Sequence, residues 1–154
     1  MAVLVVLAVF RGMGALGIQA FRSWRAAARA ALAMMLCFTA SAHFVPGLSE
    51  DLVRMVPPWV PNLQLMVQAT GILEFLGACG LLIPRTQRLA GIALILFFVA
   101  VFPANVHAAQ AGVTLLGEPA TALWLRAPLQ AFFIWLAWWS TKRGSPVPGT
   151  KGTA

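Results

Sequence analysis

The sequence has few charged residues and very few acids. Charged residues make up 10% of the 154-residue chain, and only four of them are aspartate or glutamate. An ordinary globular chain has roughly a quarter of its residues charged. Because 60% of this chain is hydrophobic and its mean hydropathy is +0.84, it has too little polar surface to cover a soluble core. We therefore expect lipid to cover it, and we predict a single all-α transmembrane helical bundle.

Cysteine is also scarce, which excludes several kinds of site. The two cysteines, Cys37 and Cys79, form neither a C-x-x-C pair nor a zinc-binding pattern. Both fall in apolar segments, where a lone cysteine usually behaves as a small hydrophobic residue. The sequence therefore predicts no metal site, and it carries no dithiol, flavin or iron–sulfur signature of its own.

The excess of basic residues does not indicate nucleic-acid binding. The formal charge is +7 and the pI is near 11.5, but no basic patch with interleaved aromatic residues is present. The basic residues flank apolar runs instead, which is typical of membrane proteins. The segment 12–17 matches G-x-G-x-x-G, but it lies inside an apolar run, where small residues favour close helix packing over dinucleotide binding. We expect no nucleic-acid partner and no nucleotide cofactor.

Five apolar segments reach or approach the roughly 20 residues that a membrane-spanning helix needs. They are 2–21, 27–45, 63–83, 88–107 and 122–140. The first segment has no basic stretch before its apolar run, and Arg11 interrupts its middle. This arrangement favours a membrane span over a cleaved signal peptide.

The chain divides into three parts around these segments. We expect an N-terminal transmembrane helix at 1–22, a four-helix membrane domain at 23–143 and a disordered cytoplasmic tail at 144–154. Within the membrane domain, the 46–62 loop should form an interfacial helix capped by Ser49, followed by a stiff proline-rich stretch. We expect this loop to pack over the outer mouth of the bundle, because its apolar helix face would otherwise meet water.

The distribution of basic residues predicts the orientation. Eight of the eleven lysines and arginines lie after the first span, after the third span and in the tail: Arg22, Arg25, Arg29, Arg85, Arg88, Lys142, Arg143 and Lys151. The other two connections hold three of the four acids. Cytoplasmic loops carry the excess of lysine and arginine. The sequence therefore predicts a multi-pass protein of the bacterial cytoplasmic (inner) membrane, with the N-terminus outside and the C-terminus cytoplasmic.

Polar residues inside the predicted spans are functional candidates, since a charge at membrane depth costs roughly 2.5–3.5 kcal/mol on insertion scales. The candidates are the ionisable residues Arg11, His43, Glu74, His107 and Arg126, with Asn105 and Gln130 as neutral companions. With a rise of about 1.5 Å per residue, Glu74 lies in mid-bilayer, and all the others except Arg11 lie nearer the outer surface. The sequence thus predicts an outward-facing polar pocket with Glu74 as its floor.

Glu74 is the only acid in any predicted span. An isolated carboxylate there should either be neutral or find a cation. Arg11 has a similar depth and would form a structural ion pair with it, because burying one charge alone costs far more than burying a pair. Arg126 is the alternative partner, and the sequence leaves both open.

Several short elements stand in a characteristic order between about residues 30 and 140. They are Ser41-Ala42-His43-Phe44, the run from Met55 to Asn62, Thr70-Gly71 with Glu74 and Gly77, Leu82-Ile83-Pro84, Phe102-Pro103-Ala104-Asn105, and the run from Leu125 to Gln130. In their order and spacing the chain resembles the DoxX and DoxX-like family of small bacterial integral membrane proteins. The resemblance implies a DoxX-like four-helix membrane core, to which the first span is an addition.

The resemblance also implies a function. The family takes its name from a small membrane subunit associated with thiosulfate:quinone oxidoreduction, which suggests a quinone-linked redox membrane subunit that acts with a partner protein. His43 and Arg126 would donate hydrogen bonds to the quinone carbonyls, and Glu74 would accept or relay a proton, so these three are the candidate catalytic residues. The ligand-binding candidates are His43, Trp59, Glu74, Asn105, Arg126 and Gln130.

A second hypothesis is a non-enzymatic membrane partner or assembly factor for another membrane or redox protein. The polar groups would then hold the bundle together, and the outer loop would dock the other protein. In both hypotheses we expect the lipid bilayer and either a protein partner or a second copy of the chain as partners.

Overall fold

The computed structural model describes residues 7–9, 11–12, 23–115, 117–119 and 122–142. Most of the predicted N-terminal span and all of the predicted tail lie outside the described residues, which cover almost all of the predicted four-helix domain. This part of the chain is mainly α-helical, as predicted.

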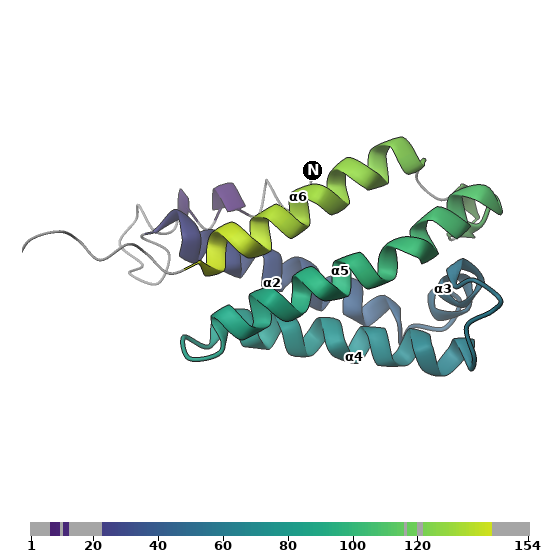
Figure 1. Ribbon diagram of the computed structural model, residues 1–154, viewed down its shortest axis with the longest axis horizontal. Coiled ribbons are helices and arrows are strands. Elements are labelled where there is room, and N and C mark those ends of the chain that lie inside the picture. Colours follow the sequence, from purple (N-terminus) through teal and green to yellow (C-terminus); the bar gives the residue numbers. More distant parts are fainter. Residues whose placement is uncertain (1–6, 10, 13–22, 116, 120–121, 143–154) are drawn as a thin grey trace, which may run out of the picture.

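The described helices coincide with the predicted segments. They are α2 (Trp24–Ala42), α3 (Leu48–Met55), α4 (Leu63–Leu82), α5 (Gln87–Gln110) and α6 (Leu123–Thr141). Between α5 and α6, the two-residue strands β1 (Thr114–Leu115) and β2 (Glu118–Pro119) pair antiparallel. Figure 1 shows the four long helices lying lengthwise beside one another, with α3 at one end of the bundle.

Local chemistry explains where the helices differ from the predicted boundaries. The helix α2 begins at Trp24 because the Ser23 side chain caps it, accepting a hydrogen bond of 3.1 Å from the Ala26 N–H. The expected Ser49 cap of α3 is wrong: Gly47 takes that position, since its φ of 84° suits a residue without a Cβ. The helix α5 continues past Pro103 to Gln110.

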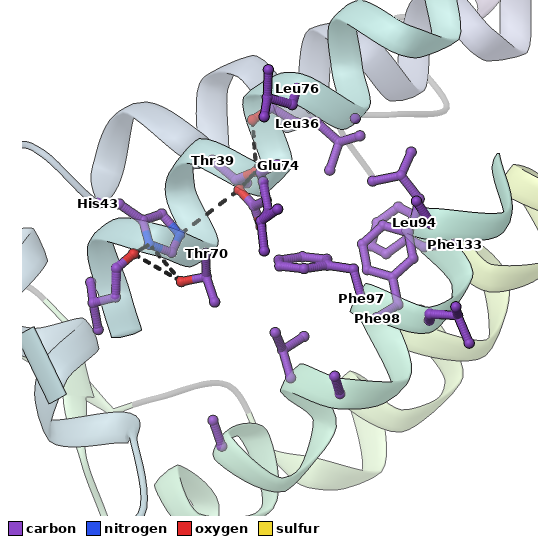
Figure 2. A pocket seen from close by; sticks show the side chains of 18 of the residues that line it. Leu36, Thr39, His43, Thr70, Glu74, Leu76, Leu94, Phe97, Phe98 and Phe133 are labelled. Carbon is purple, nitrogen blue, oxygen red and sulfur yellow. Dashed lines mark hydrogen bonds and ion pairs between the residues drawn. The ribbon is translucent and has the colours of Figure 1, made fainter. Parts of the chain in front are cut away.

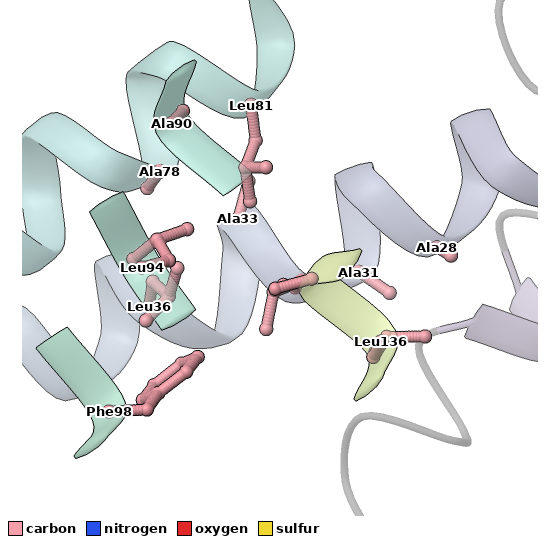
Figure 3. Packing of buried hydrophobic residues seen from close by; sticks show 12 residues of the cluster. Ala28, Ala31, Ala33, Leu36, Ala78, Leu81, Ala90, Leu94, Phe98 and Leu136 are labelled. Atoms are coloured by element: carbon pink, nitrogen blue, oxygen red, sulfur yellow. The ribbon is translucent and has the colours of Figure 1, made fainter. Parts of the chain in front are cut away.

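The four long helices form a closed ring. The helix α2 packs against α4 and α6, and α5 packs against the same two helices. The core between them contains alanines of α2 and larger side chains such as Leu36, Leu81, Leu94 and Phe98 (Figure 3). Glycines allow close helix approach: a Cβ on Gly91 would lie 2.2 Å from the Thr141 Oγ1.

The two ends of the bundle differ in composition. The α3 end holds α3, the end of α2, the start of α4 and the end of α5. The basic end holds the start of α2, the turn between α4 and α5, and the end of α6 (Figure 1).

The outer faces of α4 and α5 are strongly apolar. Within the described residues, these two helices have the length and composition needed to cross a membrane. Most residues of each helix are not buried within the chain. The exposed side chains include Ile72 and Phe75 of α4, and Leu89, Ile92 and Val99 of α5.

Candidate functional site

A cavity of about 1190 Å³ runs between α2, α4 and α5. Its walls are mostly apolar, and the segment from Leu52 to Val60 lines it at the α3 end. Leu73 and Leu96 line the cavity from α4 and α5, yet they are 53% and 65% exposed. The cavity therefore opens sideways between α4 and α5, through an apolar entrance.

Four polar side chains meet on the wall of this cavity (Figure 2). Thr39 and His43 come from α2 and its C-cap, and Thr70 and Glu74 come from α4. The Thr39 hydroxyl donates to the Glu74 Oε2 over 2.9 Å, and the His43 Nε2 lies 3.8 Å from the same oxygen. We call these four residues the His43–Glu74 cluster.

The hydrogen bonds of His43 fix its tautomer. Its Nδ1 lies 2.7 Å from the Val67 carbonyl oxygen, which can only accept, so Nδ1 carries a proton. The Nε2 atom is therefore the one that faces Glu74. The His43 Nε2 and the Glu74 carboxyl can each take up and release a proton, so the pair is suited to proton transfer.

The backbone of α4 is shaped to receive His43. A Cβ on Gly71 would lie 2.6 Å from the His43 Cβ and 2.9 Å from its Cγ. Only glycine fits at this distance without displacing the imidazole. Gly71 thus lets the end of α2 approach α4 and brings His43 to the cavity wall.

Five of the six predicted ligand-binding residues line the same cavity: His43, Trp59, Glu74, Asn105 and Gln130. Trp59 is 75% exposed, and its ring makes an edge contact with the His107 ring at a centroid distance of 6.4 Å. The His107 Nδ1 also lies 3.1 Å from the Met55 carbonyl oxygen. These contacts hold the 46–62 loop against the α3 end of the bundle.

The sixth residue, Arg126, does not line the cavity. Its Nη1 donates to the Asn105 Oδ1 over 3.0 Å, so it reaches the cavity only through Asn105. One turn further along α6, the Gln130 Nε2 donates to the Phe98 carbonyl oxygen. Arg126 and Gln130 therefore tie α6 to α5, and the expected direct contact of Arg126 with a ligand is not supported by its position.

The expected ion pair between Arg11 and Glu74 is also not formed. The Arg11 guanidinium lies 5.0 Å from the centre of the Trp24 ring, at the basic end. Glu74 instead contacts Thr39 and His43, which lie four or more helical turns further along α2. In the structure Glu74 therefore contacts a threonine and a histidine of α2 and its C-cap, and neither Arg11 nor Arg126.

Thr39 and Thr70 were not predicted from the sequence as site residues. A usable signal was present, since Thr39 precedes His43 by four residues and Thr70 precedes Glu74 by four. Residues at this spacing share one face of a helix. Two such pairs on neighbouring helices would have indicated a four-residue polar cluster.

The chain was compared with known protein families, curated proteins and solved structures. Residues 32–141 match the family described as a domain of unknown function (DUF8561). No curated protein and no solved structure gives a match to the chain. The matched residues include the whole His43–Glu74 cluster and the cavity-lining residues Asn105 and Gln130. The chain therefore belongs to the DUF8561 family.

Proposed function

We propose that the chain is a multi-pass membrane protein in which α2, α4, α5 and α6 all span the bilayer. The large apolar side chains exposed on α4 and α5 support this, because contiguous apolar surface of this extent is unusual on a soluble protein. The arginines near the start of α2 and the tryptophans near the end of α6 suit a membrane interface. The basic end then faces the cytoplasm, and a C-terminal reporter active only on the external side would overturn this orientation.

We further propose that the cavity binds a quinone. The observation that carries this proposal is the sideways apolar entrance, which joins the bilayer interior to a polar cluster on the cavity wall. Pockets for small ligands usually measure about 300–1,000 Å³, so this cavity is large enough for a quinone ring and part of its tail. Phe97 points into the space that Glu74 faces and offers a flat apolar surface to the ring (Figure 2).

The His43–Glu74 cluster would handle protons in this site. Reduction of a quinone to a quinol consumes two electrons and two protons. The described part of the chain offers His43 and Glu74 for proton transfer, while the electrons come from a redox protein that binds the chain. This places the protein as a quinone-linked membrane subunit, in keeping with its resemblance to the DoxX family.

The experiment is to purify the protein in a mild detergent, extract it with organic solvent and identify the lipophilic molecules released. We expect a quinone in a ratio that approaches one per chain. A matched preparation of His43→Ala with Glu74→Gln should release much less of it. A stable protein complex that contains no quinone would instead favour the non-enzymatic partner or assembly factor.

A further inference from the structure

The basic end carries a cluster of cations without acidic partners. Arg25 and Arg29 stand four residues apart on α2, and Lys142 follows the end of α6. The described ion pairs involve only His43 with Glu74 and Arg54 with Asp51, so none neutralises this cluster. Cations at this helical spacing repel each other, so an anion bound beside them would be stabilised.

The two arginines are already held in place by α6. The Arg29 Nη1 donates to the Ser140 carbonyl oxygen over 2.7 Å, and the Arg25 Nη1 donates to the Lys142 carbonyl oxygen over 3.3 Å. A guanidinium has five N–H donors, so each arginine keeps most of its donors available. The negative end of the α6 dipole offsets only about half a charge. The cluster therefore remains positive and rich in oriented donors.

Indole rings surround these cations. The Lys142 Nζ lies 4.5 Å from the centre of the Trp138 ring, and the Arg25 Cζ lies 6.0 Å from that of Trp139. At the same end, Arg11 packs over Trp24, and its buried Nε has no hydrogen-bond acceptor. Indoles prefer the level of the lipid headgroups, so this group of side chains suits a ligand at that level.

We propose that Arg25, Arg29 and Lys142 bind the phosphate of an anionic phospholipid headgroup. We call them the phosphate site. The proposal rests on the proposed membrane placement, although not on quinone binding. Basic groups on the cytoplasmic side of membrane helices attract anionic lipids, at about 1 kcal/mol per charge near the surface. The phosphate supplies several acceptor oxygens, and the indoles cover the start of the acyl chains.

The test uses the detergent-purified full chain and native mass spectrometry. Phosphatidylglycerol is titrated as the anionic lipid, and phosphatidylcholine serves as the lipid of zero net charge. We expect the double variant Arg25→Gln with Lys142→Gln to weaken phosphatidylglycerol binding about 25-fold, or about fivefold per charge. Arg54→Gln, an exposed arginine of α3 at the opposite end, is the matched control and should not change binding.

Equal binding of phosphatidylcholine, or undiminished phosphatidylglycerol binding by the folded double variant, would overturn the proposal. Arg29 is left unchanged because its bond to the Ser140 carbonyl supports the fold.

Inorganic phosphate is added in a parallel titration. Displacement of the lipid at equal concentration assigns the site to free phosphate, and no displacement assigns it to the lipid. Glu74→Gln should keep lipid binding, which separates failure of this site from failure of the quinone site. Release of the protein from membranes without detergent would defeat the membrane placement itself.

Discussion

The His43 Nε2 lies 3.8 Å from the Glu74 Oε2, with both side chains little exposed, at 12% and 13%. The two residues belong to different helices and are 31 positions apart in the sequence. Their contact joins the end of α2 to the middle of α4 on the wall of a large apolar cavity. The proposed quinone chemistry depends on this contact, because it places two groups that can take up and release protons beside the space that a ligand ring would occupy.

The first prediction concerns the charge of Glu74. Glu74→Gln keeps the shape of the side chain and leaves an oxygen to accept the Thr39 hydroxyl, so membrane insertion and folding should persist. Retention of the reduced quinol should fall about tenfold or more, because a quinol hydroxyl can donate a hydrogen bond to the Glu74 carboxylate, and hydrogen bonds to charged groups contribute about 1.5–3 kcal/mol. The measurement is the quinone content of the purified variant. Glu50→Gln, which changes an exposed acid of α3, is the control. Equal loss of quinone in both variants would contradict the assignment of Glu74 to the quinone site.

The second prediction separates the two threonines of the cluster. Thr39→Val removes the hydroxyl that donates to Glu74 and should lower the free energy of unfolding by about 1–3 kcal/mol. Both hydroxyls also bond carbonyls of their own helices, but the bonds that the structure gives Thr70 do not include Glu74, so Thr70→Val should cost less than about 0.5 kcal/mol. Denaturant titration in detergent micelles measures both. Equal costs would mean that the bond from Thr39 to Glu74 does not support the cluster.

The third prediction concerns the close approach of α2 to α4. In Gly71→Ala, the new methyl group meets the His43 Cβ at 2.6 Å, next to the α2 backbone, and should destabilise the fold by about 1–3 kcal/mol while displacing the imidazole. In Gly77→Ala, the first atom met is a methyl carbon of Leu94, which can move. We expect the first variant to lose quinone and the second to retain it. Equal retention in the two variants would show that His43 need not be held against Gly71.

The fourth prediction tests the structural role of Arg126. Arg126→Leu leaves the Asn105 side-chain oxygen without its donor and should cost about 1–3 kcal/mol of stability. Asn105→Leu in the same chain should restore part of this loss, because no polar group of the pair then remains unsatisfied. The full double-mutant cycle measures the coupling. Additive losses would argue against the contact, and a direct role at the ligand would instead appear as lost binding with unchanged stability.

The sequence predicted much of this fold because apolar length and polar interruptions are local signals. The segments 63–83 and 88–107 were placed almost where α4 and α5 lie. Four residues of the cavity wall, His43, Glu74, Asn105 and Gln130, were predicted because a polar residue is unusual in an apolar run. Boundaries set by single caps, such as Ser23 and Gly47, were less accurate, since several residues near a helix end can serve as caps.

The partner of Glu74 could not be predicted in the same way. The depth of a residue along its helix can be estimated from the sequence, but the direction in which the helix faces depends on packing against its neighbours. Arg11 and Arg126 were predicted as partners of Glu74 because they are charged. The observed partners are a threonine and a histidine. Gly71 allows His43 to approach α4 because it has no side chain. A pattern of charges in the sequence does not show such close packing.

The most direct test of the quinone site is photolabelling of the purified chain with an azidoquinone, followed by peptide mapping. If the cavity binds quinone, we expect label to attach to cavity-lining positions of α4 and α5, such as Leu73 and Phe97. Excess unlabelled quinone should prevent this labelling. Glu74→Gln should reduce the labelling, whereas Glu50→Gln should not. Label confined to outward positions such as Ile72 and Ile92, or labelling that unlabelled quinone does not reduce, would contradict quinone binding in the cavity.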